Sequence, residues 1–201
     1  MRAFAVLALW FLFAGRTFAA DTLTSADVTL LLKGEPVVRV TRDAKSQSFA
    51  SGRAFAAIDV PAPAEAIFAA LTDCARAKTF VKNLVTCRSV KRDPNGAWEV
   101  RETIMRISVA LPDFRAVARL DYVRPKQIRF RQTEGNFDYA EGQWDLMPFR
   151  EGKATRLFYR VRAGTSMPIP EFVIQNMIQS ELPETLKALR AEAVRGAAAK
   201  P

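Results

Sequence analysis

Few residue types in this chain are able to catalyse a reaction. The 201-residue sequence contains no histidine and only two cysteines. Histidine-based triads, Cys–His pairs and histidine-ligated zinc or iron sites are therefore excluded. The phosphate-binding patterns G-x-x-x-x-G-K-[ST] and G-x-G-x-x-G are also absent. General acid–base catalysis would fall to Asp, Glu, Tyr or Lys side chains.

Three side chains are the candidates for such chemistry: Tyr122, Tyr159 and Glu102. The two tyrosines fall at strand positions that are expected to face the interior. Glu102 has two other interpretations, an exposed strand residue or one member of an ion pair. We therefore expect a binding protein rather than an enzyme, with no catalytic residue, no metal and no cofactor.

A larger set of residues is expected to line a site for an apolar small molecule or lipid. Alternation along the predicted strands brings bulky apolar side chains to one face, and apolar pockets with a few polar groups are typical small-molecule sites. The small residues Ala116 and Ala118 favour unfilled space on that face, and a solid core is the alternative. The predicted polar contacts are Tyr122, Tyr159, Gln132 and Asn176. The complete predicted lining is Trp98, Ile104, Leu120, Tyr122, Phe130, Gln132, Trp144, Leu157, Tyr159, Phe172, Asn176 and Met177.

A group of arginines is expected on the opposite face of the sheet. Such a surface would suit docking to anionic lipid. A solvated face is the alternative, because Glu141 and Asp145 lie on the strand between them and would form cross-strand pairs, which add little stability when exposed. The arginines are Arg115, Arg119, Arg129, Arg131, Arg156, Arg160 and Arg162.

The N-terminus has the pattern of an export signal. Arg2 is followed by an apolar stretch from Phe4 to Gly15, and small residues then allow cleavage after Ala19 or Ala20, with Ala19 favoured. An uncleaved anchor or a buried helix is the alternative. Cleavage lowers the net charge from +9 to +7, which still favours anionic surfaces. We expect a monomer in the periplasm, where nucleic acid is not a partner.

Export also bears on Cys74 and Cys87. In an oxidising compartment two cysteines indicate a disulfide, which would join the end of the first helical region to the second strand of the main domain. The alternative is a pair of buried free thiols.

The expected domain organisation is a signal over 1–20, an extension with a short helix and a strand over 21–53, one domain over 54–195, and a tail over 196–201. Strands are predicted at 36–41, 54–60, 84–92, 97–111, 114–123, 127–133, 139–147 and 154–163, and a loop at 43–53. Helices are predicted at 24–34, 64–71, 76–83 and 170–195. Hairpin-linked strands followed by one long amphipathic helix predict an α+β fold, in which a curved antiparallel sheet wraps around the C-terminal helix.

Several local phrases, in this order, resemble the START-like (SRPBCC) superfamily, in particular its polyketide cyclase/dehydrase and coenzyme-Q-binding branch. The resemblance extends over 54–193 and implies a helix-grip fold with an apolar cavity and no shared cofactor. It also implies functions from lipid carriage to aromatic-ring cyclisation, so the fold does not choose between carrier and enzyme. A ligand-free interaction module is a third alternative. The matching phrases are Ile58–Phe68, Ala70–Asp73, Gly142–Pro148 and Met167–Pro170.

Overall fold

The computed structural model describes residues 22–43, 46–48, 50–106 and 112–199, so the predicted export signal lies outside the described residues. The α+β prediction is confirmed. The helices are α1 (Ser25–Leu32), α2 (Ala64–Thr72), α3 (Cys74–Phe80) and α4 (Glu171–Ala198). The strands are β1 (Val37–Thr41), β2 (Ala50–Val60), β3 (Leu84–Arg92), β4 (Trp98–Met105), β5 (Phe114–Val123), β6 (Gln127–Gly135), β7 (Tyr139–Phe149) and β8 (Ala154–Thr165).

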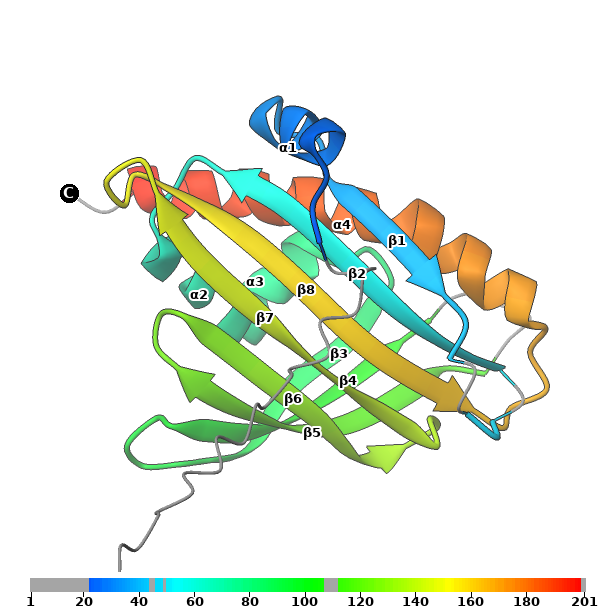
Figure 1. Ribbon diagram of the computed structural model, residues 1–201. Helices are drawn as coiled ribbons and strands as arrows, with labels where there is room; N and C mark the ends of the chain where they lie inside the picture. Colours follow the sequence, from blue (N-terminus) through cyan, green and yellow to red (C-terminus); the bar gives the residue numbers. More distant parts are fainter. Residues whose placement is uncertain (1–21, 44–45, 49, 107–111, 200–201) are drawn as a thin grey trace, which may run out of the picture.

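The strands form one antiparallel sheet in the order β1-β2-β8-β7-β6-β5-β4-β3. The sheet curves around α2, α3 and α4, and we call the face toward these helices the inner face (Figure 1). The opposite, outer face carries α1 and is turned to the viewer in Figure 1. The pairing of β6 with β7 is short, because it joins only 127–131 to 141–145. The predicted arrangement of a bent sheet around the C-terminal helix is therefore present.

Local sequence signals explain where the helices begin. Thr24 caps α1 and forms a reciprocal capping box with Asp27. Pro63 and Pro170 stand at the N-caps of α2 and α4, where their fixed φ and missing N–H cost no helical hydrogen bond. Pro183 lies inside α4, which continues on both sides of it.

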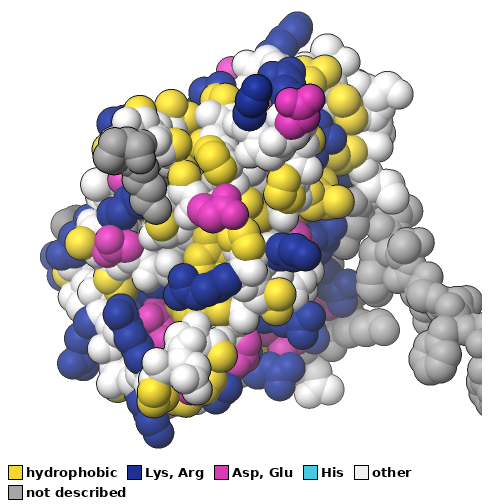
Figure 2. All heavy atoms as spheres, turned by 90° about the vertical axis from the view of Figure 1, so that its left-hand side faces the viewer, with side chains coloured by type: hydrophobic (Ala, Val, Ile, Leu, Met, Phe, Trp, Pro, Cys, Tyr) yellow, Lys and Arg dark blue, Asp and Glu magenta, His cyan; other side chains and the backbone are white. Residues whose placement is uncertain are grey.

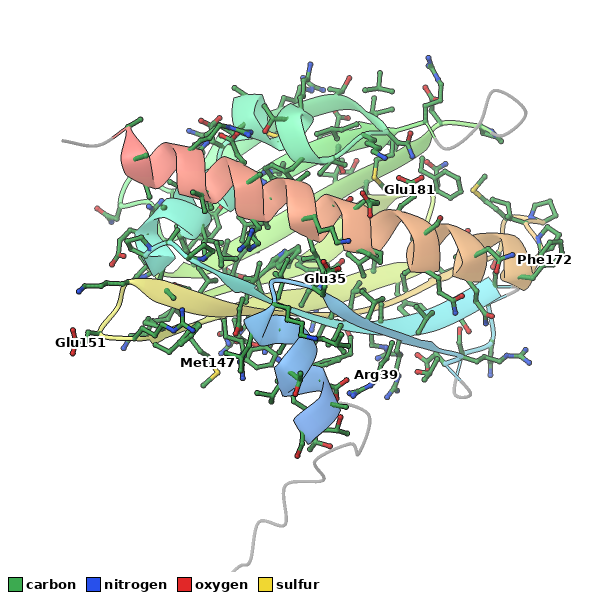
Figure 3. The ribbon with its side chains drawn as sticks, turned by 90° about the horizontal axis from the view of Figure 1, so that it is seen from above. Glu35, Arg39, Met147, Glu151, Phe172 and Glu181 are labelled. Atoms are coloured by element: carbon green, nitrogen blue, oxygen red, sulfur yellow. A yellow bond between two sulfur atoms is a disulfide. The ribbon has the colours of Figure 1, made fainter. Side chains whose placement is uncertain are left out.

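The N-terminal extension braces the sheet. β1 pairs with β2 and adds an edge strand, while Leu31 of α1 packs on Phe55 and Ala57 of the outer face. Figure 3 shows α1 and the helix pair α2–α3 on opposite sides of the molecule. The loop expected over 43–53 is shorter than predicted, because β2 already begins at Ala50 and pairs there with Thr165 of β8. The extension and the main domain are thus joined through hydrogen-bonded strands.

The main core lies between the inner face and the helices. Ile58 and Leu157 from the sheet, Ile67 from α2, and Leu186 and Leu189 from α4 are fully buried together. The helical residues lie on the apolar stripes of their helices, and the strand residues lie at alternating positions, as the helical period of about 3.6 and the strand period of about 2 predict. The fully buried residues Leu186, Leu189 and Ala193 all lie in the C-terminal half of α4.

Candidate ligand-binding site

The inner face of β5 to β8 is only partly covered by α4. The helix packs mainly on β1, β2, α2 and α3, which leaves the middle strands of the sheet further from it. Inner-face side chains there remain partly exposed although they lie on the core side of the sheet. They include Ala118, Tyr122, Phe130, Gln132, Trp144 and Tyr159. Incomplete packing at these positions makes this region the candidate binding site.

Stacked aromatic rings form the middle of this candidate site. The Trp144 and Tyr159 rings stack with centroids 4.1 Å apart, and the Phe130 ring also stacks on Tyr159 with centroids 6.1 Å apart. Strand register places all three on the inner face, because Trp144 is opposite Tyr159 and Phe130 is opposite Gly142. Such flat apolar surfaces suit the binding of an apolar or aromatic ligand.

Polar atoms without partners accompany the rings. Among the described residues, the Tyr122 hydroxyl and the Gln132 Oε1 atom are buried and have no hydrogen-bond partner. The Gln132 amide donates to the Phe137 carbonyl oxygen at 2.7 Å. Burial raises the pKa of Tyr122 and of Tyr159, so both hydroxyls stay protonated as donors. Tyr122, Tyr159 and Gln132 are three of the four predicted polar contacts, and their contact with a ligand stays a prediction.

A buried ion pair lies beside this region. The Arg101 guanidinium donates to Glu99 at 2.5 Å and to the carbonyl oxygens of Leu71 and Thr72 at 2.9 and 3.0 Å. It therefore satisfies carbonyl groups at the C-terminus of α2, which have no partner inside the helix. Arg101 thus caps the C-terminus of α2, and Glu99 balances its charge, which indicates a structural role for the pair.

The prediction that Trp98 and Ile104 of β4 face the interior is wrong, and the Glu99–Arg101 pair shows why. Because Glu99 and Arg101 face the helices, the period-two alternation turns Trp98 and Ile104 to the outer face. Trp98 lies under the Arg119 guanidinium, 4.5 Å from its ring centroid, and Ile104 is opposite Arg115. The alternation of β4 did not reveal this orientation, because its apolar residues are normally expected to face the interior.

Glu102 is also on the outer face, where Arg88 and Arg115 both donate to it. These hydrogen bonds lower the pKa of Glu102, with Arg88 the larger cause. The ion-pair interpretation of this residue is confirmed, although its side chain is buried rather than exposed. A role for Glu102 inside the candidate site is contradicted.

The N-terminal half of α4 departs from the predicted lining in part. Phe172 is 65% exposed and projects at the end of the helix in Figure 3, and Asn176 is exposed as well. The side chain of Met177 is outside the described residues. Leu120 and Leu157 face the inner side as predicted and are buried in the core, so they support the site rather than line open space.

The arginines of the outer face are mostly paired. Arg160 contacts Asp145 at 2.8 Å, Arg156 contacts Asp59 at 2.7 Å, and Glu141 accepts from Arg131 and Arg162. The expected cross-strand pairing with Glu141 and Asp145 is therefore confirmed.

A disulfide joins Cys74 to Cys87, whose Cα atoms are 5.3 Å apart. It ties the start of α3 to β3, as the cysteine pair predicted. Within the described part of the chain, no three His, Cys, Asp or Glu side chains are grouped to hold a metal ion. None of the described helices is long and apolar enough to span a bilayer.

An eight-stranded antiparallel sheet around a long C-terminal helix defines a START-like helix-grip protein. The model of the family described as polyketide cyclase/dehydrase and lipid transport matches residues 60–190. The chain belongs to this family. No curated protein sequence matches the chain significantly.

Solved structures with similar folds are diverged in sequence. A STAR-related lipid transfer protein from Xanthomonas axonopodis superposes with a TM-score of 0.63 at 16% identity, covering 80% of this chain and 94% of that one. The Zhui aromatase/cyclase from Streptomyces sp. R1128 has a TM-score of 0.60 at 14% identity, with 79% and 95% covered. Human STARD10 gives 0.62 at 14% identity, with 79% and 69% covered. At these identities the likeness establishes the fold alone.

Proposed function

We propose that the protein is an exported carrier that binds an apolar or amphipathic small molecule or lipid between the inner face of β5–β8 and α4. The observation that carries this proposal is the partly exposed stack of Phe130, Tyr159 and Trp144 on the core side of the sheet. Covering such surface with a ligand contributes roughly 25 cal/mol per Å² of apolar area removed from water.

The polar groups of the site supply orientation rather than catalysis. The Tyr122 and Tyr159 hydroxyls are neutral donors, and Gln132 Oε1 is an acceptor. The buried carboxylate of Glu99 is paired with Arg101 and Arg92, which is the arrangement of a structural ion pair. This arrangement favours carriage over the alternative, a cyclase-like enzyme that acts on a polyketide.

Filling the site tests the proposal. Ala118 is a partly exposed inner-face residue of β5, and Ala118→Leu adds bulk where a ligand would lie. Ala97 is exposed in the β3–β4 turn, so Ala97→Leu is the matched control. Native mass spectrometry and lipid extraction of the purified exported protein should show a bound mass of a few hundred daltons in the wild type and the control, reduced at least fivefold by Ala118→Leu.

Two results would contradict carriage. One is a wild-type protein that is empty in every preparation. The other is a bound mass that Ala118→Leu leaves unchanged, which would place the ligand elsewhere.

Export has a separate test. The disulfide is consistent with an oxidising compartment, and cleavage after Ala19 would expose Ala20 as the first residue. N-terminal sequencing of protein from the periplasmic fraction should read Ala-Asp-Thr. Recovery of intact chain in the cytoplasm alone would overturn the proposed location without affecting the binding site.

A further inference from the structure

A large groove lies on the outer face, on the side of the sheet away from the candidate carrier site. Its volume is about 990 Å³, and it runs across the strands from β1 to β5. Eight arginines and three acidic residues line it. The arginines are Arg39, Arg42, Arg53, Arg119, Arg129, Arg131, Arg160 and Arg162, and the acids are Asp43, Asp121 and Glu141. Positive charge therefore exceeds negative charge within the groove.

Strand register arranges many of these groups in two adjacent rows. In one row Arg39, Phe55, Arg160, Gln143 and Arg129 are cross-strand neighbours in succession. In the other row Arg53, Arg162, Glu141, Arg131 and Arg119 follow one another in the same way. Each row crosses five strands that lie about 4.8 Å apart, so it extends roughly 19 Å across the sheet.

Two of the three acids of the groove, Asp43 and Glu141, are each shared by two arginines, whereas Asp121 pairs with Arg119 at 2.9 Å. Glu141 accepts from both Arg131 and Arg162 at 3.1 and 3.3 Å, and Asp43 contacts Arg162 at 3.3 Å in addition to Arg53. Arg129 donates to the uncharged side chain of Gln127. Each guanidinium has five N–H donors, so these contacts leave donors of Arg129, Arg131 and Arg162 for a ligand.

Aromatic contacts hold part of this arrangement in place. The guanidinium carbons of Arg39 and Arg160 lie 5.6 and 5.4 Å from the centre of the Phe55 ring. Stacking of this kind fixes the plane of a guanidinium, which lowers the cost of aligning its N–H groups with an anion.

We propose that this groove is a second binding site, for a chain-like ligand that carries several phosphate groups. Planar, bidentate donors recognise phosphate oxygens well, and two rows of arginines supply repeated contacts along an extended anion. The hollow shape fits a chain or a phosphorylated headgroup better than it fits a flat bilayer. The two charged rows are on the outer face and take no part in the proposed carrier function, although Phe130 and Gly142 also line the groove.

The test uses the full chain, with inorganic tripolyphosphate as the probe in isothermal titration calorimetry at low salt. Arg129 and Arg131 are exposed neighbours on β6, so the variant Arg129→Gln with Arg131→Gln removes two charges from the groove. The matched control is Arg150→Gln with Lys153→Gln, in the exposed β7–β8 turn. Figure 3 shows Glu151 of that turn far from Arg39, and Figure 2 shows basic side chains at that end dispersed among acidic and apolar ones.

We expect the groove variant to bind tripolyphosphate at least tenfold more weakly than the wild type, and the control to change affinity less than twofold. Arg129→Lys with Arg131→Lys keeps the charge but loses the planar donors, so we expect at least a threefold loss of affinity for tripolyphosphate. If the Gln variant fails to fold, this Lys variant tests the proposal in its place. Absence of saturable binding by the wild type, or an equal loss in groove and control variants, would overturn the proposal.

Vesicles identify the source of the phosphate. Binding to phosphatidylglycerol but not phosphatidylcholine vesicles, together with tripolyphosphate binding and loss of both in the Gln variant, supports a lipid-linked headgroup. Tripolyphosphate binding alone supports a soluble ligand. Vesicle binding without tripolyphosphate binding would replace the groove with a flat membrane contact.

Discussion

The ring of Phe130 lies over Gly142, its neighbour on the adjacent strand. A Cβ atom at position 142 would be 2.7 Å from Phe130 Cζ and 2.1 Å from the carbonyl oxygen of Arg160. The absence of a side chain at this position therefore lets Phe130 reach toward Tyr159 and complete the aromatic stack. One glycine in the middle of β7 thus shapes the candidate site.

Gly142→Ala should destabilise the protein by about 2–3 kcal/mol, because the new methyl group overpacks a site bounded by backbone. Urea unfolding measures the change. Gly52→Ala is the control, since a Cβ there meets its nearest neighbour, the Thr41 carbonyl oxygen, at 3.4 Å. Equal stability of the two variants would mean that Phe130 and β8 move aside freely.

Tyr122→Phe should change the free energy of unfolding by less than about 1 kcal/mol, or increase it, because the hydroxyl that it removes is buried without a hydrogen-bond partner among the described residues. Tyr139→Phe is the comparison, since the Tyr139 hydroxyl donates to Asp43 at 3.1 Å. That change should cost about 1.5 kcal/mol, as expected for a hydrogen bond to a charged group. A large loss in Tyr122→Phe would reveal an interaction that this structure does not contain.

Reduction of the Cys74–Cys87 disulfide should lower stability by about 3 kcal/mol in the chain-entropy model, given a sequence separation of 13. Chemical unfolding with and without a thiol reductant measures this. The double variant Cys74→Ala with Cys87→Ala should unfold at the same denaturant concentration under both conditions. A reductant effect in that variant would show that the loss has another origin.

Acid should weaken the contact between α4 and α3. Hydrogen bonds from Arg195 and then Arg76 hold the pKa of Glu192 below its ordinary value of 4.5. A carboxyl group whose folded pKa is lowered stabilises the protein above its unfolded pKa and loses this contribution as pH falls through the folded value. Glu192→Gln should therefore be less stable than the wild type at pH 7, with the difference shrinking below about pH 4.5. A difference independent of pH would mean that the charge of Glu192 is not involved.

Most of the fold could be predicted from local patterns. β3 and β5 begin and end where the alternation and the turn residues placed them, and Asp93–Gly96 forms the expected turn, with Gly96 at φ 71°. The phase of β4 could not be predicted in this way, because Arg101 faces inward to satisfy the carbonyl groups of a helix that precedes it in the chain by about thirty residues. That interaction is a tertiary contact between β4 and α2, so it cannot be predicted from the sequence of β4 alone.

Part of the candidate site could also be predicted from strand alternation. Phe130, Trp144 and Tyr159 lie on strands whose inner positions are mostly apolar, so alternation alone places them on the correct face. Phe172 is predicted to line the mouth of the site, but it precedes the buried stripe of α4 and its side chain is exposed. The outer groove could not be predicted as a cavity, since its hollow shape comes from the twist and curvature of the whole sheet.

The short pairing between β6 and β7 has a mechanical consequence. At one edge of the sheet β1 of the N-terminal extension pairs with β2, and at the other edge the disulfide joins β3 to α3. Beyond Arg131 and Glu141 the strands β6 and β7 share no register, so this pair has fewer cross-strand partners than β7 and β8 have. We therefore expect a ligand larger than the interior space to separate β6 from β7 before it displaces either edge of the sheet.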